Sequence, residues 1–212
     1  MEADKVLSEA MNPPLPTANE LTRMQDERTE AWHQPMIPKT GSLDEFEHLA
    51  EAQHRANFDL WHEEDRARDP EASDTEIATV KRSIDRINQQ RNDLIEKIDR
   101  YFLSRLEKSV RSYRDAPLHS ETPGMMIDRL SILALKIFHT REQVERTDAS
   151  EAHRKRNQAR LAILLEQRQD LSVALDNLLA EALHGRRGFK LYRQLKMYND
   201  PELNPAIYKH KS

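Results

Sequence analysis

The sequence contains no cysteine and only four glycines in 212 residues. Without cysteine there is no disulfide, thiolate zinc site, iron–sulfur cluster or cysteine nucleophile. Average glycine usage is about 7%, so its scarcity argues against phosphate-binding loops, dinucleotide-binding turns and hairpin-rich folds. No apolar run approaches the ~18 residues of a membrane span, and the first residues lack the basic-then-apolar order of a signal peptide. We therefore expect a cytoplasmic protein without a membrane span.

Charge is unevenly distributed along a chain whose net charge is −4. Residues 1–41 carry seven acidic and four basic side chains, whereas residues 186–212 carry seven basic and two acidic ones. The basic C-terminal segment indicates either a nearby anion or contact with the acidic remainder of the chain. A chain that is acidic overall lacks the strongly basic surface of a duplex-DNA-binding domain, so we expect no nucleic-acid partner.

Proline and glycine positions predict long helices. Residues 71–116 and 124–200 contain no proline, and glycine occurs only at positions 41, 124, 185 and 188. Apolar residues recur at helical spacing in both intervals, and no segment alternates as a strand does. The sequence predicts an all-α fold: a bundle of four main long helices with an N-terminal arm, a short C-terminal helix and an extended tail.

Capping signals set the expected boundaries. The four main helices are expected over 43–68, 74–113, from 123 onward, and over 147–184, with short helices over 20–32 and 189–198. Ser42 with Glu45 has capping-box spacing, and Thr122 followed by Pro123 is a strong start signal. Residues 1–41 are then a flexible arm and 42–212 a single helical domain, of which 188–212 form an appendage.

Two of these helices carry polar faces that a plain bundle does not require. On the second main helix the polar face comprises Lys81, Asp85, Asn88, Asn92 and Asp99. On the third, otherwise apolar, the polar edge comprises Asp128, Arg129, Lys136, His139 and Gln143. Arg91 lies within the apolar stripe itself. These faces indicate either hydrogen bonds and ion pairs that fix helix register, with Asp85 and Asp99 as partners for the cations, or the wall of a ligand site.

The first main helix has a polar face of its own. Its members are His54, Asn57, Trp61, Asp65 and Arg68. His62 and Asp65, three residues apart, are also acid–base candidates. A lone His-x-x-Asp pair is weak evidence for a metal ligand set, so we predict no metal site.

The turn before the third main helix is the most distinctive local feature. A helix N-terminus attracts anions through its free N–H groups and dipole, and Gly124 would let a ligand approach the backbone. His119 and Glu121 are acid and base candidates there. The alternative is a capped, rigid turn between two long helices.

The C-terminal segment interleaves bases with aromatic residues. Its candidate ligand-binding residues are Tyr192, Lys196, Tyr198 and Asn199. They could form a lid that binds phosphates, or belong to an amphipathic helix that packs on the rest of the domain.

Four stretches together resemble a known family. They are Asn57–Arg68 (NFDLWHEEDRAR), Ile84–Asp93 (IDRINQQRND), Glu121–Lys136 (ETPGMMIDRLSILALK) and Tyr192–Pro201 (YRQLKMYNDP). In this order they resemble the bacterial family named "domain of unknown function 4254", over about residues 43–208. The resemblance implies an all-helical protein with no established activity. Genes of this family often lie near glycosyltransferases of surface-polysaccharide pathways, which implies a sugar-nucleotide or glycan connection.

Two functions follow. In the first, the polar faces form one site for a phosphorylated small molecule, a nucleotide or nucleotide sugar. Arg129 and Lys136 hold the anion, whereas Asp85, Asn88 and Asn92 bind hydroxyls or a base. In the second, the protein is a non-enzymatic accessory subunit of a glycosyltransferase. Whether the protein is an enzyme, and which cofactor it takes, stay open; long apolar helix faces make a homodimer plausible.

Overall fold

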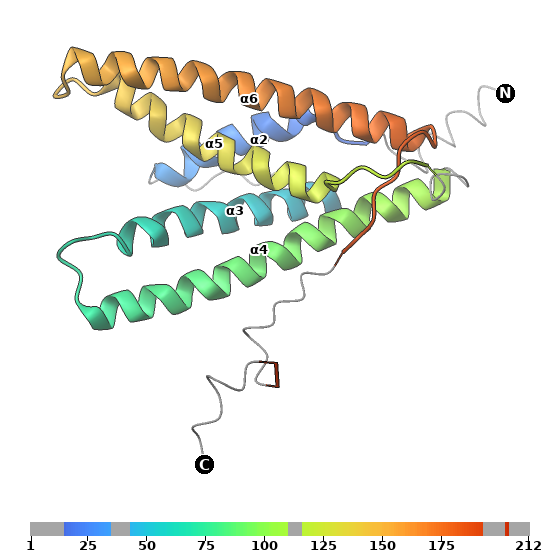
Figure 1. Cartoon of the computed structure of the whole chain (residues 1–212), viewed down its shortest axis with the longest axis horizontal. Coiled ribbons are helices and arrows are strands. Elements are labelled where there is room, and N and C mark those ends of the chain that lie inside the picture. The colour runs from blue at the N-terminus through green and yellow to red at the C-terminus, as the bar shows by residue number, and fades with distance from the viewer. Residues whose placement is uncertain (1–14, 35–42, 110–115, 193–201, 204–212) are drawn as a thin grey trace.

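The computed structural model describes residues 15–34, 43–109, 116–192 and 202–203. Its helices are α2 (Ala18–His33), α3 (Glu45–Arg66), α4 (Asp74–Ser109), α5 (Pro123–Glu145) and α6 (Glu151–Leu183) (Figure 1). Within these residues the only β pairing is one isolated bridge, between Leu118 and Gly188. The all-α prediction is confirmed. Among the described residues no helix is both long and apolar enough to cross a membrane.

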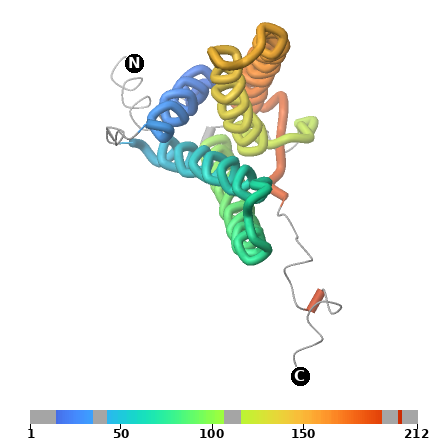
Figure 2. Tube along the Cα trace, turned by 90° about the vertical axis from the view of Figure 1, so that its left-hand side faces the viewer, coloured from blue at the N-terminus to red at the C-terminus, as the bar shows by residue number. Residues whose placement is uncertain are grey.

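The five helices share one core. Figures 1 and 2 show α3 and α4 as one antiparallel pair, α5 and α6 as a second pair, and α2 packed beside α5. Each helix contributes a buried side chain to the main apolar cluster: Leu21, Phe46, Phe102, Leu130 and Leu178, in chain order. A helix of 36 residues such as α4 is stable because its apolar face packs on neighbours rather than through propensity alone.

The capping predictions are partly corrected. Thr122 is the N-cap of α5 and Pro123 its first residue, as predicted. The N-cap of α3 is Asp44, whose carboxylate accepts from Glu47 N at 2.8 Å; the expected cap, Ser42, lies outside the described residues. Helix α6 begins after Ser150, whose hydroxyl accepts from the third helical N–H. That cap explains why the helix starts later than residue 147.

Helix α2 is the short helix expected over 20–32. A capping box between Thr17 and Glu20 starts it, and Ala18 N also donates to Asp176 Oδ1 of α6 at 2.8 Å. Leu21 and Gln25 are buried. The division of the chain at residue 41 stays a prediction, but α2 packs in the same core as the helices that follow.

The short C-terminal helix expected over 189–198 is wrong in its first part. Residues 189–192 are not helical. Gly188 exchanges backbone hydrogen bonds with Pro117 and His119, at 3.0 and 2.7 Å, and Phe189 is buried in the core. This pairing holds the chain extended, and residues 193–198 lie outside the described part.

Candidate functional site

A buried carboxylate forms the centre of a polar network. Asp128 of α5 is only 5% exposed. Its Oδ1 accepts from Gln53 Nε2 at 2.6 Å, Asn57 Nδ2 at 3.0 Å and Arg91 Nε at 2.7 Å. Arg91 Nη2 donates to the other oxygen, Oδ2. A buried charge is tolerated only when it is paired and hydrogen-bonded, and two helices, α3 and α4, supply these partners.

The network continues toward α2 through a buried histidine. Asn57 Nδ2 also donates to Ser131 Oγ at 2.9 Å, and the hydroxyl lies 2.7 Å from His54 Nδ1. His54 Nε2 is 2.9 Å from Thr29 Oγ1, which in turn donates to the carbonyl of Gln25. Burial lowers the pKa of His54 to about 4, so the ring is neutral at physiological pH.

A pocket of about 300 Å³ opens over this network; we call it the α3–α4–α5 pocket. It is lined by Asn57, Leu60, Trp61, Glu64, Asp65, Arg68, Arg91, Ile132 and Leu135. Four lining residues, Asn57, Trp61, Asp65 and Arg68, belong to the polar face predicted from sequence. Arg68 donates to Glu64 Oε2 at 2.9 Å and lies 3.7 Å from Asp65 Oδ1.

Arg91 is the fixed cation of the pocket. Its side chain is 22% exposed, and hydrogen bonds to Asp128 raise the pKa of its guanidinium. These bonds use Nε and Nη2, and no hydrogen bond of Nη1 is found within the described part of the chain. A bidentate carboxylate holds the guanidinium plane in one orientation.

Aromatic rings support the pocket wall at Trp61. The indole stacks on His139 of α5, with ring centroids 4.8 Å apart and planes 12° apart. His139 belongs to a group with His33 and His62, whose ring centroids are 5.0–6.1 Å apart. Burial, with the nearby His33 and His139, lowers the pKa of His62. His62 therefore lies in this ring cluster, whereas Asp65 lies in the pocket.

The remaining anion-binding and acid–base candidates line a different pocket. It has a volume of about 640 Å³, and we call it the α5–α6 pocket. His119, Glu121, Arg129 and Lys136 are among its lining residues. Arg129 Nη1 donates to both oxygens of Glu121, at 2.7 and 2.8 Å, so the expected partners Asp85 and Asp99 are wrong for this arginine.

The N-terminus of α5 is occupied by a carboxylate of the protein itself. Asp99 of α4 is 2% exposed, and its Oδ1 accepts from Gly124 N at 2.7 Å. A Cβ at Gly124 would lie 2.6 Å from the carbonyl oxygen of Ile95, so glycine here admits the α4 backbone rather than a ligand. Burial raises the pKa of Asp99 to about 6, against the hydrogen bonds from Thr122 and Gly124.

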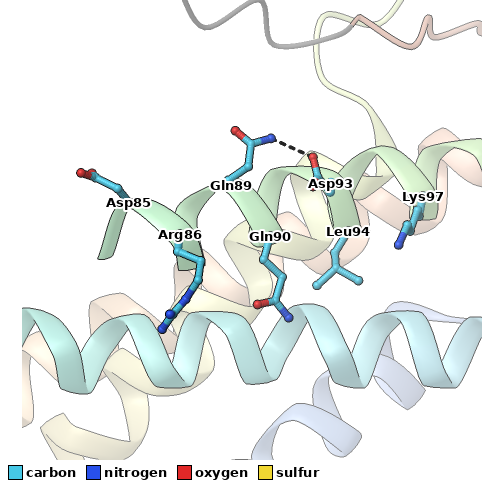
Figure 3. A pocket seen from close by; sticks show the side chains of 7 residues that line it. All are labelled: Asp85, Arg86, Gln89, Gln90, Asp93, Leu94 and Lys97. Carbon is cyan, nitrogen blue, oxygen red and sulfur yellow. Dashed lines mark hydrogen bonds between the residues drawn. The ribbon is translucent and has the colours of Figure 1, made fainter. Parts of the chain in front are cut away.

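The other predicted residues of α4 do not line either pocket. Asp85 pairs with Lys81 on the exposed side of α4. It borders an outer hollow with Arg86, Gln89 and Lys97 (Figure 3). Asn88 and Asn92 are half-buried.

The C-terminal candidates are only partly described. Tyr192 is 71% exposed, and Lys196, Tyr198 and Asn199 lie outside the described residues. In the described part of the chain, no three His, Asp or Glu side chains are arranged to hold a metal ion.

Sequence reasoning missed several members of the network. Gln53 was not predicted, although it lies four residues before Asn57 on the same helix face. Ser131 and Thr29 carry no distinctive sequence signal. Arg91 had one, since a cation within an apolar stripe needs a buried partner.

The chain belongs to the family described as "Protein of unknown function (DUF4254)", whose model matches residues 47–191. The match covers α4, α5, α6 and all but the first two residues of α3, and α2 lies outside it. No curated protein matches the chain. No solved structure matches it either.

Proposed function

We propose that the α3–α4–α5 pocket binds a phosphorylated small molecule, a nucleotide or nucleotide sugar. The observation that carries the proposal is Arg91, whose guanidinium is held by Asp128 and which lines a pocket that also contains Trp61. A fixed guanidinium binds phosphate through charge-assisted hydrogen bonds, and an indole face binds a flat ring.

Arg68 is a second cation for the anion. Arg68 lies in the turn that follows α3 and is held by Glu64 and Asp65 at the end of that helix, in exposed pairs that contribute about 0–1 kcal/mol. A phosphate can therefore take Arg68 from these partners at little cost, and the freed carboxylates can accept from ligand hydroxyls. Arg91, by contrast, stays on Asp128, because a broken buried pair costs several kcal/mol.

The test is a thermal-shift panel of nucleotides, nucleotide sugars, sugar phosphates and inorganic phosphate, each with and without magnesium or manganese. A ligand at 100 times its Kd adds about 2.7 kcal/mol to stability, which raises Tm by several degrees for a domain of this size. We expect a shift from at least one class of phosphorylated compound.

Variants separate binding from folding. Arg91→Met with Asp128→Asn removes both charges together and keeps a side-chain oxygen for the buried amides of Gln53 and Asn57. This variant should abolish the ligand-induced shift. The matched control is Arg86→Met, an arginine of the same helix on the outer hollow (Figure 3), which should keep the shift. A shift that survives in the double variant refutes the role of Arg91. A flat panel favours the accessory-subunit function instead.

A further inference from the structure

The two pockets adjoin at one residue of α5. Ile132 lines both the α3–α4–α5 pocket and the α5–α6 pocket. Arg129 and Lys136, three and four residues away on the same helix, flank Ile132 at the neighbour spacing of about 5–6 Å between Cβ atoms. We therefore take the two pockets as adjoining halves of one groove along α5. Figure 1 shows α5 between α6 on one side and the pair of α3 and α4 on the other.

The two halves differ in chemistry. The first contains the indole of Trp61, whose ring suits a flat heterocycle. The second has four apolar lining residues, Met126, Leu133, Leu171 and Ala174. Its polar rim includes His119, Gln167 and Asp170, which can exchange hydrogen bonds with hydroxyl groups.

Cations gather where the halves meet. Arg91 lies on the first side of Ile132, and Arg129 and Lys136 lie on the second. Arg129 is held by Glu121 in a half-exposed pair, which an incoming phosphate can replace. The first pocket alone, at about 300 Å³, is at the lower limit of ligand pockets, which run to about 1,000 Å³.

Resting on the proposed function, we infer that the groove binds a two-ended ligand joined by a diphosphate, the nucleotide-sugar class. The base stacks on Trp61. The diphosphate crosses Ile132 between Arg91 and the α5 cations, and the sugar enters the α5–α6 pocket. A nucleoside monophosphate fills the first pocket only and makes no contact with Lys136.

Isothermal titration calorimetry on the full chain tests this inference. The probes are the monophosphate and the diphosphoglucose of each common nucleoside: adenosine, cytidine, guanosine, thymidine and uridine. We expect the diphosphoglucose of at least one nucleoside to bind tenfold or more tightly than its monophosphate, since each charge-assisted hydrogen bond is worth about a factor of ten or more.

The variant Arg129→Gln/Lys136→Gln should bring diphosphoglucose affinity to the monophosphate level and leave monophosphate affinity unchanged. Both side chains are exposed, so the fold should persist. Lys155→Gln, an exposed lysine of α6 paired with Glu151, is the matched control and should change neither affinity.

The outcomes are distinguishable. If a monophosphate binds but its diphosphoglucose gains nothing, the two-pocket inference is wrong and the proposed function stands. Equal weakening of both probes by the double variant also overturns the inference, because the α5 cations then act on the first pocket. If no probe binds, the inference is wrong, and the proposed function fails as well when the thermal-shift panel is also flat.

Discussion

Acidification should destabilise this protein through one buried histidine. His54 is fully buried between Ser131 and Thr29, and burial lowers its pKa from 6.5 to about 4. The unfolded chain therefore binds a proton at a pH where the folded chain does not, so stability falls as pH drops below 6.5. One pKa unit corresponds to 1.36 kcal/mol. The loss is about 2 kcal/mol at pH 5 and about 3 kcal/mol at pH 4.

The variant His54→Gln isolates this contribution. Glutamine does not titrate, and the lost hydrogen bond makes the variant less stable at pH 7 by about 1–3 kcal/mol. As pH falls from 7 to 4, the wild type should lose this advantage, and the two stabilities should converge. With a urea m-value of about 2 kcal/mol/M, the relative midpoint shift is roughly 1 M between pH 7 and 5.

Urea unfolding followed by tryptophan fluorescence is a suitable assay, because Trp32 stacks on His54 with centroids 5.2 Å apart. His48→Gln, at an exposed histidine of the same helix, is the control and should follow the wild type at every pH. Parallel loss of stability in wild type and His54→Gln would refute the reasoning, since the acid sensitivity would then come from other groups.

Three further predictions concern the helix contacts beneath the site. Arg91→Met alone leaves Asp128 buried without its cation and should cost about 3–5 kcal/mol in urea unfolding, whereas Arg91→Met/Asp128→Asn, which removes the carboxylate charge and keeps an oxygen for Gln53 and Asn57, should recover part of that loss; equal costs would mean that Asp128 is solvated. Gly124→Ala places a Cβ 2.6 Å from Ile95 O and 2.8 Å from Asp99 Oδ1, so α4 and α5 must separate, and calorimetry should show a loss of about 1–3 kcal/mol. Asp99→Asn keeps an oxygen for Gly124 N and removes a carboxyl group whose pKa is raised to about 6. Because a raised pKa stabilises the protein at low pH only, the variant should gain on wild type by up to about 3 kcal/mol between pH 4 and 7; a constant difference would contradict this.

Much of the fold could be predicted because its signals are local. Thr122 and Pro123 mark the start of α5 through capping geometry alone, and the proline-free intervals delimit the long helices. The predictions are wrong where tertiary contacts determine the backbone conformation. Phe189 begins an apolar periodicity that reads as helix, but pairing of Gly188 with the 117–119 segment holds the chain extended.

The candidate site was harder to predict because periodicity shows which residues share a helix face but not which helix packs against that face. The face of α3 with Asn57, Trp61 and Asp65 was predicted, since all three follow one helical stripe, whereas Arg68 lies in the turn after the helix. Its neighbour across the pocket, Arg91, requires knowing how α4 packs on α5. That packing depends on Gly124, where the absence of a Cβ lets the α4 backbone approach.

Asp128 and Arg129 show most clearly what a helical projection cannot predict. They are adjacent in the chain and were assigned to one polar edge, because both fall within about 100° on a helical projection. That angle is enough to separate them completely. Asp128 points between α3 and α4 and is buried, whereas the Arg129 side chain is 54% exposed and lines the α5–α6 pocket. Ile132 lies between these two directions and lines both pockets. The polar edge predicted from the sequence therefore lies along the boundary between the two pockets, which can bind different parts of one ligand.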